Sequence, residues 1–224
     1  MKITYLGTGA ADWNITLHKE IEGFRRNSSA LIDDCLLIDP GPNVMDALQT
    51  FGKDASKIKY IINTHKHSDH YCEETISNLP SAQFFEFGFN EEKQIGNYTI
   101  KAYEANHSTC KDAVHFIIND GEKKLFYGLD SAWLMYDEVA AIKEQGIDYA
   151  VLDATIGDVP GDYRIFEHNN LNMIKEMKYS LQEYVKRFCI SHMAKTLHGS
   201  HEELVENMRE FDIEVAFDGM ETEI

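Results

Sequence analysis

The chain has 224 residues, long enough for one large buried core, and its acidic side chains outnumber the basic ones by 38 to 21, giving a net charge of −17. A protein that binds long nucleic acids normally presents a basic face, so this balance argues against a long polyanionic partner but not against a small anion. No apolar run approaches the ~20 residues of a membrane helix, and residues 1–7 are too short and mixed for a signal peptide. We therefore expect a cytoplasmic protein without a membrane partner.

Alternating apolar segments and turn residues predict an α/β architecture with two similar halves. In the first half we expect strands at 2–6, 28–32, 35–38 and 59–63, and helices at 43–51 and 70–79. In the second we expect strands at 82–87, 98–103, 114–118, 124–127, 149–152, 187–190 and 214–217, and helices at 137–145, 170–179 and 202–211. No linker or low-complexity segment divides the chain, so we expect one domain over residues 1–224. The four cysteines form no Cys-x-x-Cys pair, which argues against a disulfide framework or a structural zinc knuckle.

The most informative segment is residues 64–71, Thr-His-Lys-His-Ser-Asp-His-Tyr, which directly follows a predicted strand. His65 and His67 are two positions apart and can converge on one metal ion. Asp69 and His70, which we expect to turn into the start of the next helix, can serve a second ion. Imidazole with carboxylate is the ligand set of zinc, manganese or iron rather than calcium or magnesium. A histidine-rich loop in solvent is the alternative, but the strand before the segment and the helix after it favour a metal site.

This His-x-His-x-Asp-His segment resembles the metal motif of the metallo-β-lactamase superfamily, and other motifs of the chain follow in the order typical of that family. An Asp-Pro-Gly turn at 39–41 precedes it, and His107, Asp130 and His192 follow it, each after a predicted strand. The resemblance spans nearly the whole chain. It implies an αβ/βα four-layer sandwich with metal ions at one edge of two sheets.

The resemblance also implies two divalent metal ions, zinc or manganese, with iron as a further option. Seven side chains would bind them: His65, His67 and His107 the first ion, Asp69, His70 and His192 the second, and Asp130 both. Asp39 would accept the free ring N–H of a ligand histidine instead of binding an ion. Two cations would lower the pKa of a bridging water toward neutrality and so supply hydroxide as the nucleophile.

Several of these residues have a plainer interpretation from the sequence alone. His107 could lie in a polar surface turn, Asp130 could cap a helix that starts near residue 132, and His192 could be a core histidine. We expect the remaining histidines at the surface, in the core or at helix caps: His18, His115, His198 and His201. His198 and His201 could also lie at the rim of the pocket.

The segment from Val151 to Thr155, followed by His168 at the head of a predicted helix, is similar to the phosphodiesterase branch of the superfamily, which includes ribonuclease Z. The resemblance implies that Asp153 and His168 form a pair that shuttles a proton to the leaving oxygen. A carboxylate bonded to an imidazole keeps it in one tautomer and raises its pKa, which suits general acid catalysis. The alternative is a histidine at a helix N-terminus that has no partner.

A closer resemblance within that branch is to the cyclic phosphodiesterases of the carbon–phosphorus lyase pathway. Four segments carry it: Arg25-Arg26 leading into Ser28-Ser29, His168-Asn169, Ser191-His192, and Glu214–Glu221 near the end of the chain. The chain departs from that group in two respects. It has no cysteine between positions 9 and 25, where the group has a further zinc site, and its Asp-Pro-Gly-Pro turn replaces the usual Asp-Ala-Gly.

We therefore expect a binuclear metal-dependent hydrolase, a phosphodiesterase on a small or cyclic phosphate ester, with Asp69, His168 and Asp153 as its catalytic residues. Thioester, lactone and β-lactam hydrolases share the metal ligands but have no use for the pair of Asp153 and His168. A ribonuclease Z-like nuclease would need a long insertion and a basic surface. A redox di-iron protein would normally carry glutamate in place of His67, and an interaction module would be expected to lose ligands. The sequence leaves open the substrate, the native metal and the role of Lys66, and it is compatible with a homodimer.

Overall fold

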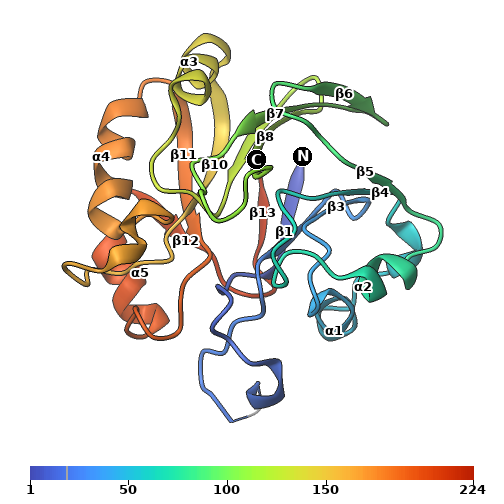
Figure 1. Cartoon of the computed structure of the whole chain (residues 1–224), viewed down its shortest axis with the longest axis horizontal. Coiled ribbons are helices and arrows are strands. Elements are labelled where there is room, and N and C mark those ends of the chain that lie inside the picture. Colours follow the sequence, from blue (N-terminus) through green and yellow to red (C-terminus); the bar gives the residue numbers. More distant parts are fainter. Residues whose placement is uncertain (19) are drawn as a thin grey trace.

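The computed structural model describes residues 1–18 and 20–224. Two β-sheets pack face to face, and helices cover the outer face of each (Figure 1). This arrangement is the four-layer αβ/βα sandwich that the resemblance implied. Its two sheets correspond to the two predicted halves of the chain with one correction: the strand at Gln83–Phe85, expected in the second half, pairs with Tyr60–Ile62 in the first sheet.

The first sheet has six strands in the order β13-β1-β2-β3-β4-β5. Their bounds are Glu221–Glu223, Lys2–Gly7, Ser29–Ile32, Leu36–Ile38, Tyr60–Ile62 and Gln83–Phe85, and helices α1 (Val44–Thr50) and α2 (Glu73–Ser77) belong to this half. Strands β3, β4 and β5 run parallel, so their carboxyl ends meet at one edge of the sheet. The last strand of the chain, β13, returns to pair antiparallel with the first, β1.

The second sheet has seven strands in the order β12-β11-β10-β9-β8-β7-β6. Their bounds are Ile213–Val215, Val185–Ser191, Ile147–Asp153, Lys124–Gly128, Val114–Asn119, Tyr98–Glu104 and Glu92–Ile95. Strands β9 to β12 run parallel, as crossover helices require. Three helices belong to this half: α3 (Tyr136–Gln145), α4 (Leu171–Leu181) and α5 (His201–Arg209). Short 3₁₀ turns lie at Ile15–Leu17, Ala55–Lys57 and Tyr163–Phe166.

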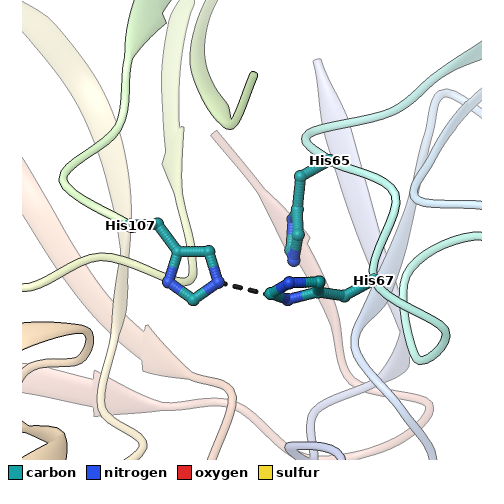
Figure 2. Close-up of side chains that lie close together, drawn as sticks. All are labelled: His65, His67 and His107. Atoms are coloured by element: carbon teal, nitrogen blue, oxygen red, sulfur yellow. Dashed lines mark hydrogen bonds between the residues drawn. The ribbon is translucent and has the colours of Figure 1, made fainter. Parts of the chain in front are cut away.

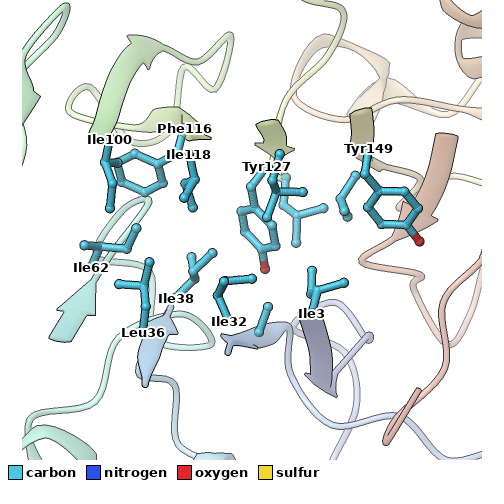
Figure 3. Close-up of a cluster of buried hydrophobic side chains, with 14 of the residues drawn as sticks. Ile3, Ile32, Leu36, Ile38, Ile62, Ile100, Phe116, Ile118, Tyr127 and Tyr149 are labelled. Carbon is cyan, nitrogen blue, oxygen red and sulfur yellow. The ribbon is translucent and has the colours of Figure 1, made fainter. Parts of the chain in front are cut away.

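The core between the sheets is built from β-branched and aromatic side chains that alternate along the strands (Figure 3). In β4, for example, Ile62 faces the other sheet, whereas Ile61 packs in the cluster that includes α1. Both are fully buried. A strand buried on both faces is apolar along its length, which is why Tyr60-Ile61-Ile62 gave a clear signal. Each buried isoleucine contributes about 1.5–3 kcal/mol of transfer free energy.

The structure corrects the predicted helix over 70–79, because α2 covers only Glu73–Ser77. Residues 67–71 form a turn in which the N–H groups of His70 and Tyr71 bond to the carbonyl of His67. The Cys72 N–H then bonds to the carbonyl of Pro40. The expectation that Asp69 and His70 enter the helix is therefore wrong: the turn holds both side chains on the same side as the other candidate ligands.

Two strands were not predicted, β6 and β13. Their sequences are Glu-Lys-Gln-Ile and Glu-Thr-Glu, and each lies at the edge of its sheet with exposed residues. Polar edge strands lack the apolar alternation on which the prediction depends. None of the described helices has the length and apolar character needed to cross a bilayer.

Candidate active site

The candidate site residues lie at the carboxyl ends of strands in both sheets, the edge where α/β folds place their chemistry. Asp39 directly follows β3, Asp153 ends β10 and His192 directly follows β11. Asp39, Asp130 and His192 all have left-handed backbone conformations, with φ of 59°, 55° and 64°. Such conformations cost free energy for residues other than glycine, and they cluster at functional sites. Here they turn the chain sharply, so that the side chains project over the sheet edge.

The first cluster consists of His65, His67 and His107, whose rings converge from two loops (Figure 2). The Nε2 atom of His107 lies 3.2 Å from the Nδ1 atom of His67. The Nε2 atom of His65 is buried and has no hydrogen-bond partner among the described residues. Burial lowers the pKa of both His65 and His107. The structure therefore gathers three ring nitrogens, and the lowered pKa of His65 and His107 favours the neutral form that binds metal ions.

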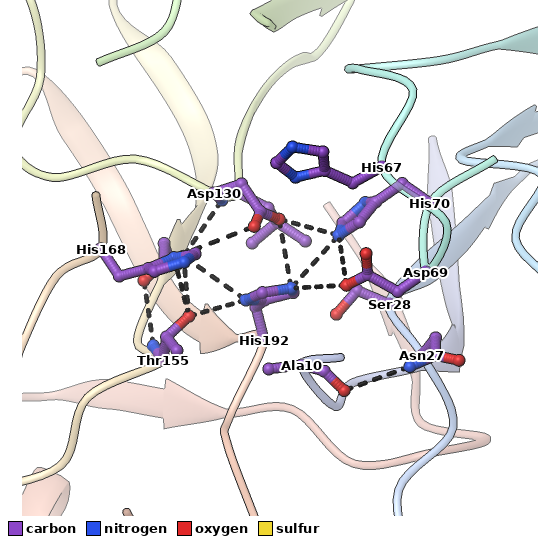
Figure 4. Close-up of polar contacts among 12 residues, drawn as sticks. Ala10, Asn27, Ser28, His67, Asp69, His70, Asp130, Thr155, His168 and His192 are labelled. Atoms are coloured by element: carbon purple, nitrogen blue, oxygen red, sulfur yellow. Dashed lines mark hydrogen bonds and ion pairs between the residues drawn. The ribbon is translucent and has the colours of Figure 1, made fainter. Parts of the chain in front are cut away.

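The second cluster consists of Asp69, His70 and His192, with Asp130 at its centre (Figure 4). The Nε2 atoms of His70 and His192 lie 2.8 and 3.1 Å from Oδ2 of Asp130. They lie 3.4 and 3.6 Å from Oδ2 of Asp69. Asp130 also groups with His65 of the first cluster, so its carboxylate stands between the two sets of ligand atoms.

Carboxylates and a hydroxyl fix the outer nitrogens of the two histidines in the second cluster. The Nδ1 atom of His70 donates to Oδ2 of Asp39 at 2.9 Å. The Nδ1 atom of His192 donates to the hydroxyl of Thr155 at 2.7 Å. The opposite nitrogen of each ring, Nε2, therefore carries a lone pair directed into the cluster. Asp39 thus has the contact predicted for it.

This donor set fits a cation. The Nε2 atoms of His70 and His192 face each other at 3.2 Å, and both face the carboxylate of Asp130. Burial alone would lower the pKa of both rings, but the neighbouring carboxylates outweigh it: they raise the pKa of His70 well above its usual value and that of His192 to about 10. The site therefore favours added positive charge at this point, which a proton supplies weakly and a divalent cation strongly.

Asp153 and His168 form the pair predicted from the sequence. The Nδ1 atom of His168 lies 2.9 Å from Oδ2 of Asp153, which is fully buried. The ring of His168 lies between those of His107 and His192, at centroid distances of 5.3 and 5.6 Å, and it stacks on His192. Burial opposes the charged form of His168, but the charge and hydrogen bond of Asp153 prevail and raise its pKa. The alternative, a histidine without a partner, is therefore wrong.

Asp153 also organises the residues around it. Its Oδ2 accepts the backbone N–H of Asp130 at 3.0 Å, and its Oδ1 accepts the N–H groups of Thr155 and Asn169 at 2.9 and 3.1 Å. Burial would raise the pKa of Asp153, but the charge and hydrogen bond of His168, together with those of His192, outweigh it and lower that pKa. An ionised carboxylate thus connects the backbone of one candidate ligand with the candidate general acid.

Sequence reasoning missed Glu167, which precedes His168. One oxygen of Glu167 lies 3.2 Å from Nδ1 of His107, and the same carboxylate accepts hydrogen bonds from Ser108 and from the backbone and hydroxyl of Thr109. Glu167 therefore joins the loop of a candidate metal ligand to the loop of the candidate general acid. The one feature of the sequence that could have pointed to Glu167 is that this carboxylate directly precedes His168.

The structure also tests the plainer roles that the sequence alone allowed for His107, Asp130 and His192. His107 is 4% exposed and faces other histidines, so it does not lie in a surface turn. Asp130 caps no helix, because α3 begins only at Tyr136. His192 is buried, as a core histidine would be, but both of its nitrogens have polar contacts. Lys66 pairs with Glu86, and its side chain is 60% exposed, so it points away from the clusters.

The four remaining histidines have separate contacts. His18 bonds to the carbonyl of Ile15. His115 is fully buried between Glu138 and the carbonyl of Leu129. His198 and His201 line one cavity, whose wall includes none of the candidate metal ligands.

Comparisons with known proteins agree with this geometry. A family model described as the metallo-beta-lactamase superfamily matches residues 23–73, which include the turn at Asp39 and the motif at 65–70. No curated protein matches the chain.

Several solved structures share the fold over nearly their whole length. Zinc-bound PqqB from Methylobacterium extorquens is 16% identical, with a TM-score of 0.77 and coverage of 100% of both chains. A diphosphatase of the PhnP family is 17% identical, with a TM-score of 0.76 and coverage of 100% of this chain and 98% of that one. The short form of human tRNase Z is 16% identical, with a TM-score of 0.72 and coverage of 100% and 99%. The chain is thus similar to the metallo-beta-lactamase superfamily over residues 23–73, and it shares its overall fold with these solved structures.

Proposed function

We propose that this protein is a binuclear metal-dependent phosphodiesterase that acts on a small or cyclic phosphate ester. The observation that carries the proposal is the pair of Asp153 and His168, which stands against both histidine clusters. Bound divalent cations would lower the pKa of a water and neutralise charge that develops on the phosphoryl oxygens. Zinc, manganese and iron all suit the imidazole and carboxylate ligands.

Seven residues would hold the two ions. His65, His67 and His107 offer three ring nitrogens to the first, and Asp69, His70 and His192 offer a carboxylate and two nitrogens to the second. Asp130 would contact both. Asp69 is ionised, because the charge of His70 outweighs burial and lowers its pKa. Its carboxylate would also orient the attacking water by accepting a hydrogen bond.

His168 would protonate the leaving oxygen. Its Nδ1–H donates to Asp153, which leaves Nε2 as the nitrogen that can donate to a substrate. The raised pKa of His168 keeps a larger fraction of the ring protonated near neutral pH. A protonated imidazole at this position offsets the poor leaving tendency of an alkoxide, which is the task of a general acid.

Two further observations support a phosphate ester over the alternatives. The structures with the same fold include a diphosphatase of the PhnP family and a tRNase Z. The net charge of −17 disfavours a ribonuclease Z-like role on a long nucleic acid and leaves a small ester as the better candidate.

The proposal is tested by turnover of bis(p-nitrophenyl) phosphate by protein reconstituted with zinc or manganese, beside a chromogenic β-lactam and a thioester. We expect cleavage of the diester, abolished by a chelator and restored by the metal. His18→Ala is the matched control for His168→Ala, since within residues 1–18 and 20–224 the side chain of His18 forms its hydrogen bond with the local carbonyl of Ile15. Cleavage of the lactam or thioester with the diester untouched would refute the proposal.

A further inference from the structure

His115 and Glu138 form a polar pair that joins the second sheet to α3. His115 lies on β8, Glu138 lies in the first turn of α3, and both side chains are fully buried. The Nδ1 atom of His115 bonds to Oε1 of Glu138, whose other oxygen accepts the Met135 N–H at 2.7 Å. Among the described residues, neither belongs to a group that could hold a metal ion. The pair is therefore separate from the candidate ligands.

The other nitrogen of His115 connects this pair to a candidate ligand. Nε2 lies 3.0 Å from the carbonyl oxygen of Leu129, the residue directly before Asp130. A carbonyl oxygen can only accept a hydrogen bond, so Nε2 carries a proton and donates it. The N–H of the same Leu129–Asp130 peptide donates to Oδ2 of Asp153 at 3.0 Å. Since the C=O and N–H of a trans peptide point in opposite directions, His115 and Asp153 hold one peptide group from two sides.

The peptide held in this way leads into a strained residue. Asp130 has a left-handed φ of 55°, a conformation that persists at residues other than glycine only where the surroundings impose it. Its carboxylate stands between the Nε2 atoms of His70 and His192 (Figure 4). Rotation of the peptide before Asp130 would move the carboxylate out of that place. The hydrogen bonds at the two ends of the peptide oppose this rotation.

A role in packing alone explains the pair of His115 and Glu138 less well. An imidazole and a carboxylate are costly to take out of water, and an apolar pair of similar size often serves a core equally well. Burial would lower the pKa of His115, but the charge and hydrogen bond of Glu138 outweigh it and raise that pKa, which favours a ring with a proton on both nitrogens. What an apolar pair could not supply is the hydrogen bond to the carbonyl of Leu129.

The chain also leaves room for this ring. His115 packs against the edge of Phe126, with ring centroids 5.7 Å apart. A Cβ atom at Gly128 would lie 2.5 Å from the ring of Phe126 and 3.2 Å from Nδ1 of His115. The absence of a side chain at Gly128 thus allows the imidazole to reach both Glu138 and the carbonyl of Leu129.

We propose that His115 and Glu138 are positioning residues that fix the Leu129–Asp130 peptide, so that the carboxylate of Asp130 is held between the two histidine clusters before an ion binds. This inference rests on the part of the proposed function that makes Asp130 a ligand of both ions, and it is independent of the substrate. His115 and Glu138 act through the peptide and do not touch the reacting atoms. Because Asp130 would contact both ions, loss of this hold should weaken the binding of both.

The test compares two double variants that differ only in the residue that replaces His115. His115→Gln with Glu138→Gln keeps an amide donor for the carbonyl of Leu129 and an amide acceptor for the Met135 N–H, without charge. His115→Phe with Glu138→Gln fills the same space with a ring that cannot donate. We expect the first to bind both metal ions nearly as the wild type does, and the second to bind both about 10- to 100-fold more weakly. Competition with a chromogenic chelator measures both affinities. Equal affinities in the two double variants, or a loss confined to one ion, would overturn the inference.

Ile117→Val is the control for lost packing. Ile117 lies two residues further along β8, on the same face as His115, and belongs to the apolar cluster that includes Ala141 and Ile142 of α3. We expect this variant to lower the thermal stability of the metal-free protein and to leave both metal affinities unchanged. A loss of affinity as large as that of the phenylalanine variant would reduce the role of His115 to packing and overturn the inference.

A measurement on the unaltered protein covers the case in which the phenylalanine variant does not fold. Long-range ¹H–¹⁵N correlation spectra of the metal-free protein at pH 7 show which ring nitrogens carry protons. We expect a proton on Nε2 of His115. A bare Nε2 could not bond to the carbonyl of Leu129 and would overturn the inference.

Metal binding is measured without a substrate, so the inference and the proposed function can fail separately. If the ions bind as expected to the wild type and to both double variants but no diester is cleaved, the catalytic proposal fails and the positioning role stands. If the diester is cleaved but the two double variants bind both ions equally well, the positioning role of His115 and Glu138 fails and the proposed function stands.

Discussion

Asp39 and Asp153 hold equivalent positions on opposite sides of the candidate metal centre. Both are fully buried at strand ends, and each accepts the Nδ1–H of an imidazole at 2.9 Å, from His70 and His168 respectively. The consequence differs between the two. The free nitrogen of His70 points at Asp130 among the candidate ligands, whereas His168 stands beside the clusters and can serve as an acid.

A threonine extends each of these pairs to a second histidine. The hydroxyl of Thr64 donates to Asp39 at 2.9 Å and lies 3.0 Å from Nδ1 of His65. The hydroxyl of Thr155 donates to Asp153 at 3.0 Å and lies 2.7 Å from Nδ1 of His192. Each buried carboxylate therefore orients two imidazoles, one directly and one through a hydroxyl.

Replacement of His168 by alanine should lower kcat for a diester by about 10²- to 10⁴-fold, because the leaving oxygen loses its proton donor. The metal content should stay at the wild-type value, since His168 is held by Asp153 and is not among the proposed ligands. Kinetics with metal analysis of the same preparation checks both points. A loss of one metal equivalent would make His168 a ligand instead.

The variant Asp153→Asn should shift the alkaline limb of the kcat profile to lower pH. His168 must be protonated to act as an acid, and Asp153 raises its pKa, so wild-type activity is lost only as pH rises through that raised pKa. Without the negative charge the pKa of His168 falls, and activity is lost at a lower pH. Asp158→Asn, at an exposed position on the same loop, is the control. An unchanged limb would exclude His168 as the titrating acid.

We expect Thr155→Val to weaken binding of the second metal ion by about 10- to 100-fold, the usual effect of losing a partner that orients a ligand. Valine has the same shape but cannot accept the Nδ1–H of His192. Thr155→Ser should restore most of the affinity, which competition with a chromogenic chelator measures. Equal affinity in the valine variant would mean that the hydroxyl does not position His192.

Glu167→Ala should weaken binding of the first metal ion by about 10- to 100-fold, because Nδ1 of His107 loses the carboxylate that orients it. Glu167→Gln should fall between the alanine variant and the wild type, since its carbonyl oxygen can still accept the N–H. Glu176→Ala, in α4, is the control. Selective loss of the second ion instead would contradict the arrangement proposed here.

The sequence predicted those parts of the site whose residues are close together in the chain. The segment at 65–70 could be recognised as a metal site because four candidate ligands fall within six positions. His107, Asp130 and His192 lie far apart, and it was the order of family motifs that selected them from plainer alternatives. Glu167 could not be found in this way, since its contact with His107 joins residues 60 positions apart and depends on how two loops meet.

The secondary structure likewise divides into elements that the local sequence predicts and elements that it does not. Strands buried on both faces, such as β4 and β10, were predicted within one or two residues because their apolar runs are continuous. The polar edge strands β6 and β13 were missed, and the start of α2 was placed too early. In that last case the hydrogen bonds of His70 with Asp39 and of Cys72 with Pro40 outweigh local helix propensity.

The most direct test of the central claim is the rate of diester cleavage as a function of metal added per protein molecule. Metal-free protein is titrated with zinc or manganese, and turnover of bis(p-nitrophenyl) phosphate is followed beside that of Asp69→Ala. We predict that wild-type activity rises until two equivalents are bound, and that Asp69→Ala binds one equivalent and stays nearly inactive. Full activity at one equivalent, or a fully loaded and active Asp69→Ala, would contradict the binuclear phosphodiesterase proposed here.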